Sequence, residues 1–230
     1  MIIPYSKQTI NDEDIQAVCS VLRSDWLTQG PKINEFEQKL SEYTGAKYVI
    51  MVSNGTIALQ IACKALDVRN GDLGITSPIS FIASANCIEG CGGKVDFVDI
   101  DPSTLCISVD ELEKYCKKNR VPKVVIPVDF AGIPSRLPDI KELSRKFGFR
   151  IIEDAAHAIG SNYRYNGKEY ACGSCEHADI AIFSFHPVKT ITTGEGGAIL
   201  TNDDEIANKL RSLANHGIER NPSKFINHDL

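Results

Sequence analysis

Long apolar runs, basic clusters and a leader-like start are all missing from this sequence of 230 residues. No segment approaches the roughly 20 consecutive apolar residues that a membrane-spanning helix needs. The formal net charge is −5, and no stripe of Lys and Arg typical of a nucleic-acid-binding surface is visible. The start, Met-Ile-Ile-Pro-Tyr, lacks the charged and apolar regions of a signal peptide. We therefore expect a soluble cytoplasmic protein that binds neither nucleic acid nor membrane.

The eight cysteines do not have the spacing of a disulfide framework or a zinc site. Cys172-Gly-Ser-Cys175, followed by His177, resembles half of such a site, but structural zinc takes about four ligands, usually from two such pairs. No second pair exists, since Cys87 and Cys91 are spaced as one face of a helix. We predict a turn with two free thiols and no metal. A metal-binding module built on this segment is the alternative, which metal analysis would decide.

Short β-branched segments alternate with amphipathic ones, and 43% hydrophobic residues allow one large buried core. Strands are predicted at residues 47–53, 73–77, 94–98, 123–128, 149–153, 179–183 and 197–200. Helices are predicted at residues 55–66, 80–90, 108–119, 137–147 and 203–214, with two more outside the core at 11–23 and 33–43. Ser108 and Asn202 begin two capping boxes. The alternation is typical of an α/β fold with a mostly parallel sheet covered on both faces.

Polar residues gather just after several of these strands, at the sheet edge where ligands bind in open α/β folds. They are Asn54, Gly55, Thr56, Ser80, Phe81 (an aromatic beside them), Asp129, Asp154 and Ser184. Because different strands contribute to the group, we expect its members to converge on one edge of the sheet.

Lys189 and Asp154 carry the chemistry that the sequence favours. Lys189 ends Ser184-Phe-His-Pro-Val-Lys189 and precedes a glycine-rich segment, while Asp154 directly follows an apolar strand. A lysine that forms a Schiff base and a buried acid that pairs with a pyridinium nitrogen are what pyridoxal 5′-phosphate requires of a protein. Taken singly, Lys189 reads as a solvated lysine and Asp154 as a cap. Together they indicate this cofactor.

The segment Ser53-Asn-Gly55-Thr56 opens a predicted helix directly after a strand. The free N–H groups and the positive end of a helix dipole suit a phosphate, and Gly55 allows the backbone to approach it closely. The Thr56 hydroxyl adds a donor, and Ser184 can supply another. The alternative is an ordinary Asn or Ser cap on a buried helix.

Two side chains near the predicted site have two readings each. His157 either orients Asp154 or packs on the sheet edge, and the first is slightly favoured. Phe81, at a predicted helix start, either stacks on a cofactor ring or belongs to the core. Pattern alone favours the core.

Four segments together resemble the DegT/DnrJ/EryC1/StrS sugar aminotransferases, in register from about residue 4 to the end. They are Asn54-Gly-Thr, Glu153-Asp-Ala-Ala-His-Ala-Ile-Gly, Phe183-Ser-Phe-His-Pro-x-Lys and Thr192-Thr-Gly-Glu-Gly-Gly. The resemblance implies pyridoxal-phosphate fold type I, an aspartate-aminotransferase-like large domain with a seven-stranded sheet between helices. It implies these cofactor-binding residues: Gly55, Thr56, Phe81, Asp154, His157, Ser184 and Lys189. Lys189 is then the catalytic residue, and Phe81 stacks on the ring, against the pattern-only reading.

Further segments resemble one branch of that family, the aminotransferases of pseudaminic-acid biosynthesis. They are Leu27-Thr-Gln-Gly30, Ser77-Pro-Ile-Ser-Phe-Ile-Ala-Ser-Ala-Asn86 and Val128-Asp-Phe-Ala-Gly132. The resemblance implies amination of the C4 keto group of a UDP-linked 4-keto-6-deoxy-N-acetylhexosamine. L-Glutamate is the implied donor and leaves as 2-oxoglutarate in a ping-pong reaction. The implied enzyme is a homodimer with shared sites, and its implied substrate-binding residues are Trp26, Leu27, Thr28, Gln29 and Gly30.

Members of this family are longer than the present chain. The resemblance predicts that residues 1–230 form the large domain, with N-terminal helices at about 11–43 and the sheet domain at about 46–214. Residues 215–230 would begin the link to a C-terminal small domain that is largely absent, so weak or no turnover is expected of these residues alone. The alternatives are a truncated, non-catalytic remnant of this fold and another fold-type-I pyridoxal-phosphate enzyme.

Overall fold

The computed structural model describes residues 3–4 and 6–218. Its helices are α1 (Asp12–Leu22), α2 (Pro31–Thr44), α3 (Gly55–Ala65), α4 (Ala83–Glu89), α5 (Val109–Lys118), α6 (Leu137–Phe147) and α7 (Asp204–Ala214), with the 3₁₀ turn η1 (Phe130–Gly132). Its strands are β1 (Tyr48–Val52), β2 (Leu73–Thr76), β3 (Lys94–Phe97), β4 (Val124–Ile126), β5 (Arg150–Asp154), β6 (Asn162–Tyr165), β7 (Lys168–Ala171), β8 (Ile180–Ser184) and β9 (Gly197–Thr201).

Seven of these strands form one sheet in the order β1-β9-β8-β5-β4-β2-β3. The pairs β8–β5, β5–β4, β4–β2 and β2–β3 are parallel, whereas β9 runs antiparallel to both of its neighbours. The predicted seven-stranded, mostly parallel sheet is confirmed. In this arrangement β5 and β8, which end at Asp154 and Ser184, lie side by side, so their carboxyl ends meet at one edge.

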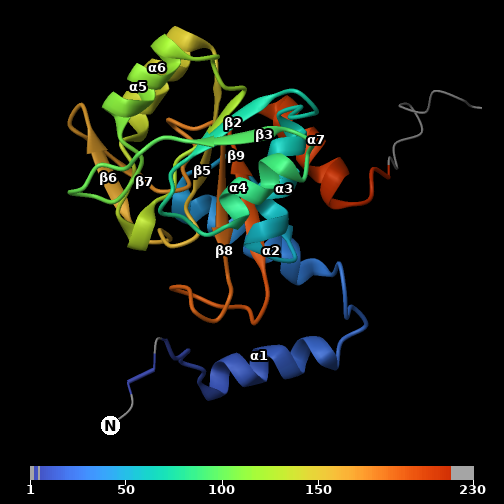
Figure 1. The fold of residues 1–230 in the computed structure, drawn as a ribbon. Coiled ribbons are helices and arrows are strands. Elements are labelled where there is room, and N and C mark those ends of the chain that lie inside the picture. Colours follow the sequence, from blue (N-terminus) through green and yellow to red (C-terminus); the bar gives the residue numbers. More distant parts are fainter. Residues whose placement is uncertain (1–2, 5, 219–230) are drawn as a thin grey trace, which may run out of the picture.

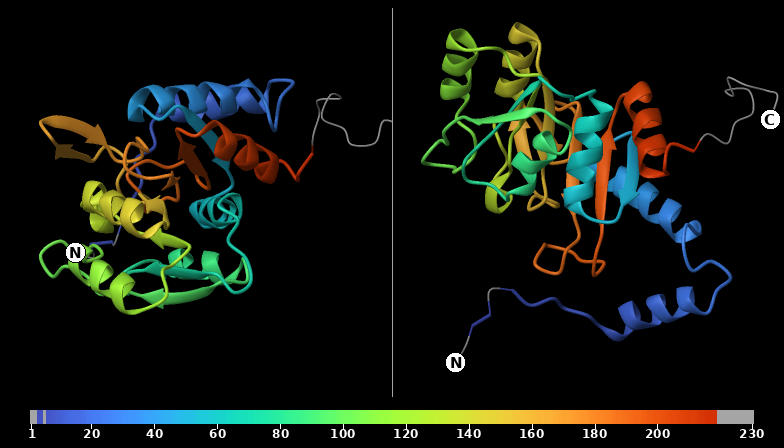
Figure 2. Two further views of the ribbon diagram at one scale, coloured as in Figure 1. Left: turned by 90° about the horizontal axis from the view of Figure 1, so that it is seen from above. Right: turned by 45° about the vertical axis from the view of Figure 1, so that its right-hand side comes forward.

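Helices cover both faces of the sheet, as the views in Figure 2 show. On one face, α3, α4 and α7 bury side chains such as Leu59, Ile88 and Leu210 against Ile152 and Ile182 of the strands. On the other face, α2 packs on the β1, β8 and β9 side, and α5 and α6 pack over β2, β4 and β5. Both faces of the central strands are therefore buried, which explains their nearly continuous apolar sequences.

Helix α1 is set apart from this body and has no buried residue (Figure 1). It forms because Asn11 and Asp14 make a reciprocal capping box at its start. The helix was predicted at 11–23 outside the core, and the structure places it there. Residues 24–30 then lead to α2, which begins with Pro31 at the first helical position and ends at Gly45 in the left-handed conformation.

Three details of the sequence prediction are wrong. The N-cap of α7 is Asp203, because Asn202 instead accepts a hydrogen bond from the Lys47 amide and donates to the Ser174 carbonyl. Helix α4 begins at Ala83 and ends before Cys91, so Cys87 and Cys91 do not share one helix.

The third error is the β6–β7 hairpin, which the prediction omitted. Its turn is Asn166-Gly167, with both residues at positive φ. Asn-Gly is the strongest short-range sequence signal for a two-residue hairpin turn.

No helix among residues 3–4 and 6–218 combines the length and the apolar character that crossing a bilayer requires. Of the predicted link at 215–230, residues 219–230 lie outside the described part of the chain.

Candidate active site

A cavity of about 640 Å³ opens at the edge where β5 and β8 end and α3 and α4 begin. Its lining includes Asn54, Gly55, Thr56, Ser80, Phe81, Phe130, Asp154, His157, Ser184, His186, Lys189 and Glu195. All seven residues predicted to bind a cofactor are in this lining. Segments more than a hundred residues apart in the chain meet here because the sheet order brings their strands together.

Asp154 ends β5 and is 3% exposed. Its Oδ2 accepts a hydrogen bond of 2.6 Å from the Ser84 hydroxyl, and its Oδ1 accepts one of 3.2 Å from the Ala156 amide. Burial raises the pKa of Asp154, and the bond from Ser84 is the strongest of the effects that oppose it. The site therefore contains a buried carboxylate that its own hydrogen bonds help to keep ionised.

Lys189 lies in the turn after β8, where its amide donates to the His186 carbonyl at 2.9 Å. The side chain is half-buried, and this burial lowers the pKa of its ammonium group, while the charge of Asp154 acts in the opposite direction. A lowered pKa increases the neutral fraction of a lysine, which is the nucleophilic form.

His157 lines the same cavity three residues after Asp154. Its Nδ1 accepts a hydrogen bond from the Ala131 amide at 3.3 Å, and its ring meets the Phe130 ring edge-on at 6.4 Å. Burial and the nearby Lys189 lower the pKa of the imidazole. The structure thus places His157 against η1, and its hydrogen bond goes there and not to the Asp154 carboxylate.

Glycines allow the start of α3 to touch the ends of β8 and β9. A Cβ on Gly55 would lie 2.9 Å from Ser184 Cβ, and one on Gly197 would lie 2.5 Å from the Asn54 carbonyl carbon. The Asn54 side chain caps α3 by accepting from the Ile57 amide at 2.9 Å. First-turn amides such as those of Gly55 and Thr56 have no acceptor within a helix, and both residues face the cavity lining. The Asn54 side chain can therefore cap α3 while the amides of Gly55 and Thr56 remain available to bind an anion.

Phe81 is 66% exposed and belongs to the cavity lining. The core position that its pattern favoured is therefore wrong, because α4 starts two residues later and leaves Phe81 in the preceding turn. An exposed phenyl ring at a cavity is available to stack on a flat ligand.

The predicted substrate-binding residues Trp26, Leu27, Thr28, Gln29 and Gly30 are not part of this lining. They lie between α1 and α2, with Trp26 60% and Leu27 66% exposed. Within the described residues the structure therefore does not bring this loop to the cavity.

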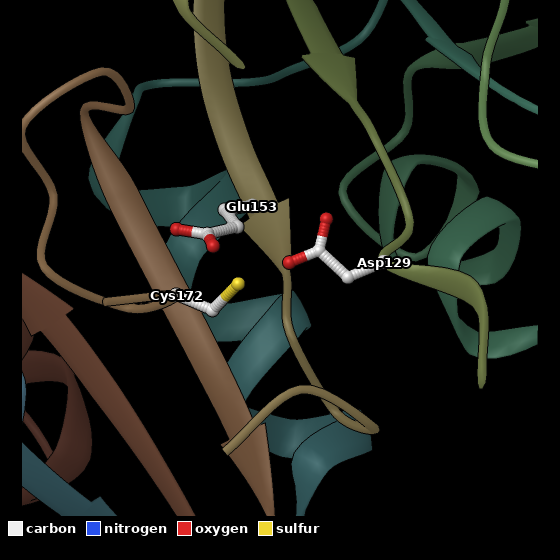
Figure 3. Close-up of side chains that lie close together, drawn as sticks. All are labelled: Asp129, Glu153 and Cys172. Atoms are coloured by element: carbon white, nitrogen blue, oxygen red, sulfur yellow. The ribbon is translucent and has the colours of Figure 1, made fainter. Parts of the chain in front are cut away.

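Asp129 was expected at the same edge but faces away from the cavity, into the protein. Figure 3 shows its carboxylate directed toward Glu153 and the Cys172 sulfur. Asp129, Glu153 and Cys172 are buried, and their ligand-type atoms lie within 4.8 Å of one another. Asp129 Oδ1 accepts from the Ser135 amide at 2.8 Å, and the Glu153 carboxylate accepts from the Gly173 amide at 3.1 Å.

The two carboxyl groups of this cluster are buried close to each other, with an oxygen of each within 4.8 Å of the other. Asp129 Oδ2 has no hydrogen-bond partner in the described part of the chain. Burial and the charge of Asp129 raise the pKa of Glu153 well above its usual range, and burial raises the pKa of Asp129 to about 6. Protonation of Glu153 would remove the repulsion between two buried charges and would give Asp129 Oδ2 a donor.

The thiols of the Cys172–Cys175 turn are both free and buried, as the sequence predicted. His177 does not approach them as a co-ligand, because its Nδ1 is 2.8 Å from the Tyr163 hydroxyl and its ring packs among Tyr163, Tyr165 and Tyr170. The sulfur of Cys172 instead faces the carboxyl pair of Asp129 and Glu153.

Sequence reasoning missed three residues of the site: Ser84, Phe130 and Glu195. Phe130 and Glu195 line the cavity, and Ser84 binds Asp154 from behind it. Ser84 lies in the segment from Ser77 to Asn86 that carries the family resemblance, and that segment is the signal that could have revealed it. Phe130 and Glu195 lie in segments that carry the family resemblance, but nothing in those segments assigned either residue a role.

Several solved structures with a similar fold are described as aminotransferases. Helicobacter pylori PseC, described as an aminotransferase involved in the biosynthesis of pseudoaminic acid, matches with a TM-score of 0.87 at 33% identity, over 95% of this chain and 57% of PseC. NtdA from Bacillus subtilis, described with bound cofactor PMP, matches with a TM-score of 0.77 at 32% identity, over 88% of this chain and 45% of NtdA. The fold is that of the fold-type-I aminotransferases.

Sequence comparison defines the family. The model of the DegT/DnrJ/EryC1/StrS aminotransferase family matches residues 8–230, and the chain belongs to that family. A UDP-4-amino-4,6-dideoxy-N-acetyl-beta-L-altrosamine transaminase from Campylobacter jejuni is 40% identical over 220 residues, which cover 94% of this chain and 56% of the relative. The chain spans between 54% and 56% of the length of the curated relatives that it matches.

Proposed function

We propose that this chain binds pyridoxal 5′-phosphate and supplies the catalytic lysine of a nucleotide-sugar aminotransferase. Its substrate is a UDP-linked 4-keto-6-deoxy-N-acetylhexosamine, which is aminated at C4 with L-glutamate as donor, in the biosynthesis of a surface sugar of the pseudaminic-acid type. The observation that carries this proposal is that Lys189 and Asp154 line one cavity in a member of this family. The printed names of the Campylobacter and Helicobacter relatives support the choice of sugar.

The cavity residues fit the three parts of this cofactor. The exposed ring of Phe81 suits the face of a pyridine ring, and the buried Asp154 carboxylate suits its nitrogen. The start of α3 at Gly55 and Thr56, with Ser184 beside it, suits a phosphate group. A half-buried lysine completes the set.

The residues of the chain then divide the work. When bound, pyridoxal phosphate supplies an electron sink for the carbanion formed in transamination. Asp154 provides the negative charge that favours a protonated ring nitrogen. Lys189 Nζ acts as the general acid/base, which moves a proton between the substrate carbon and the cofactor carbon. Burial lowers the pKa of Lys189 toward neutral pH, where such proton transfer is most efficient. His157 packs beside Asp154 and η1 and helps to enclose the cavity.

We further propose a homodimer in which the Trp26–Gly30 loop contacts the sugar nucleotide. The support is the surface of α1, where Ile15, Val18 and Leu22 are 52%, 60% and 63% exposed. Such an apolar helix face suits a subunit interface. Sedimentation of the wild type and of an Ile15→Glu, Val18→Glu variant tests this, with a dimer expected for the first and a monomer for the second.

The proposed sheet domain, residues 46–214, contains all the proposed cofactor contacts.

Eight free thiols favour a reducing compartment, and we propose that the reaction takes place in the cytoplasm.

Visible absorbance with added pyridoxal phosphate tests the proposed function. The wild type is expected to show a band that L-glutamate bleaches with release of 2-oxoglutarate, and addition of the 4-keto nucleotide sugar is expected to restore it. Lys189→Ala is expected to lose this band. Lys141→Ala is the matched control, since Lys141 is also partly buried but pairs with Asp179 outside the cavity. A chain without a lysine-dependent band would be a non-catalytic remnant. Bleaching by glutamate without restoration by the sugar would indicate another fold-type-I enzyme.

A further inference from the structure

Ser84 lies behind the cavity, in the first turn of α4, and is completely buried. Its hydroxyl donates to Asp154 Oδ2 at 2.6 Å, across 70 residues of sequence. This distance is within the range of about 2.5–2.7 Å that is typical of a hydroxyl bound to an ionised carboxylate. The contact links α4 directly to the end of β5.

Asp154 depends on few donors. Besides Ser84, the donor to its carboxylate among the described residues is the Ala156 amide, at the longer distance of 3.2 Å. Burial of Asp154 favours the protonated acid, and the Ser84 hydroxyl is the strongest of the groups that lower the pKa again. A buried carboxylate that lost this donor would retain one backbone amide and the more distant charges of His157 and Lys189.

The hydroxyl of Ser84 does not serve the local structure of its helix. Serines inside helices commonly bond back to a carbonyl of the preceding turn, but this hydroxyl donates to Asp154 instead. It does not cap the helix either, because the N-terminus of α4 has no side-chain cap. The Ser84 amide donates to the Phe81 carbonyl at 3.0 Å, so one turn of chain fixes both Phe81 and the donor to Asp154.

We propose that Ser84 is a positioning residue that holds the Asp154 carboxylate in one orientation and in its ionised state for pairing with the ring nitrogen of the cofactor. The inference rests on the proposed function. Ser84 does not line the cavity among the described residues, so it acts through Asp154 and not by contact with a ligand. The sign of its effect follows: loss of the hydroxyl favours a neutral Asp154 and weakens the hold on a protonated ring nitrogen.

The test uses the full chain with pyridoxal phosphate labelled with ¹⁵N in the ring, whose chemical shift reports protonation of that nitrogen. In Ser84→Ala, the ring nitrogen is expected to lose its proton at lower pH than in the wild type. Affinity is expected to fall about tenfold or more, as for loss of a hydrogen bond to a charged group. Ser84→Thr, which keeps the hydroxyl, is expected to restore the pH at which the ring nitrogen loses its proton and the affinity for pyridoxal phosphate.

Two controls separate this role from a structural one. Ser144→Ala removes another buried hydroxyl, which donates to the Phe149 carbonyl at 2.6 Å, and is expected to leave the ¹⁵N shift unchanged. An analogue of pyridoxal phosphate with carbon in place of the ring nitrogen is expected to bind wild type and Ser84→Ala equally. If Ser84→Ala does not fold, Ser84→Cys keeps the volume, weakens the donor and is expected to shift the titration in the same direction.

The outcomes distinguish this inference from the proposed function. A wild type that binds no pyridoxal phosphate would overturn both. If the wild type binds it and Asp154→Asn loses the ring proton while Ser84→Ala keeps it at the same pH, the inference on Ser84 is wrong and the function stands. Equal weakening of pyridoxal phosphate and its carbon analogue in Ser84→Ala would also refute the inference, because the defect would then be structural.

Discussion

The two regions that the sequence marked as functional differ in how the fold holds them. At the cavity, Asp154, Ser184 and Gly55 are fixed by neighbouring strands, a buried serine and a close helix–strand contact. The Trp26–Gly30 loop follows a helix that buries nothing, and its two largest side chains are mostly exposed. The chain therefore builds the proposed cofactor site from its own sheet, whereas the proposed sugar-binding loop has few contacts of its own to hold it.

The largest effect is expected at the cavity, from Lys189→Ala. The variant is expected to lose the visible cofactor band, and any transamination is expected to fall on the order of 10⁴-fold or more, because both the attachment point and the proton-transfer group are gone. Absorbance titration and 2-oxoglutarate release measure the two effects. An unchanged band in Lys189→Ala would show that Lys189 is not the attachment point of the cofactor. Lys141→Ala controls for the loss of a partly buried lysine outside the cavity.

Gly197→Ala tests how tightly the cavity edge is packed. The new Cβ would lie 2.5 Å from backbone atoms of Asn54, which cannot move without displacing the start of α3. The free energy of unfolding is expected to fall by about 1–3 kcal/mol or more, together with the affinity for pyridoxal phosphate, as measured by urea unfolding and titration. Gly45→Ala introduces a Cβ with nothing within 4 Å, so its cost is the strain of an alanine in the left-handed conformation, about 1–2 kcal/mol, and the affinity for pyridoxal phosphate is expected to stay unchanged. An equal loss of affinity in both variants would argue against a close contact at Gly197.

Glu153→Gln is expected to change how stability depends on pH. The folded protein retains a proton that the unfolded chain releases, since burial and Asp129 raise the pKa of Glu153 and burial raises that of Asp129 to about 6. The contribution of this pair to stability is thus full below about pH 4, where the unfolded carboxyl groups are protonated too, and it is lost as the pH rises through about 6 and beyond, by at most about 1.4 kcal/mol per pH unit for one proton. The glutamine amide can donate to Asp129 without titrating, so the slope should flatten.

Urea midpoints between about pH 5 and about pH 8 measure this slope. Glu153→Ala is the contrasting variant, since it leaves the buried Gly173 amide without its acceptor and is expected to cost about 1–3 kcal/mol. Equal slopes in wild type and Glu153→Gln would rule out a proton retained by Glu153 in the folded protein.

The smallest effect on stability is expected in the N-terminal region. Trp26→Ala removes a side chain that is 60% exposed, so the free energy of unfolding is expected to change by no more than about 0.5 kcal/mol. The proposed sugar contact predicts instead a raised KM for the nucleotide sugar, with the glutamate half-reaction unaffected. A marked loss of stability in Trp26→Ala would show that the Trp26–Gly30 loop is held by contacts as strong as those at the cavity, and would contradict this prediction.

The seven sheet strands were predicted to within about two residues, because buried strands carry apolar β-branched runs whatever their neighbours are. The β6–β7 hairpin was missed although Asn166-Gly167 signalled it, because its strands are only four residues long and contain no fully buried residue. Phe81 and Asp129 were misjudged for another reason. Whether a side chain at a strand end faces a cavity or the interior depends on the exact start of α4 and on the path of η1, which local pattern does not specify.

The sequence by itself determined the α/β alternation, the order of elements and the chemically distinctive residues Lys189, Asp154 and Gly55, because these follow from local periodicity and from side-chain chemistry. Only the tertiary structure decided which residues meet. It placed β5 beside β8, turned Asp129 toward Glu153 and brought the Ser84 hydroxyl to Asp154. Such contacts join segments distant in sequence, so they depend on strand order and packing, which no local pattern encodes.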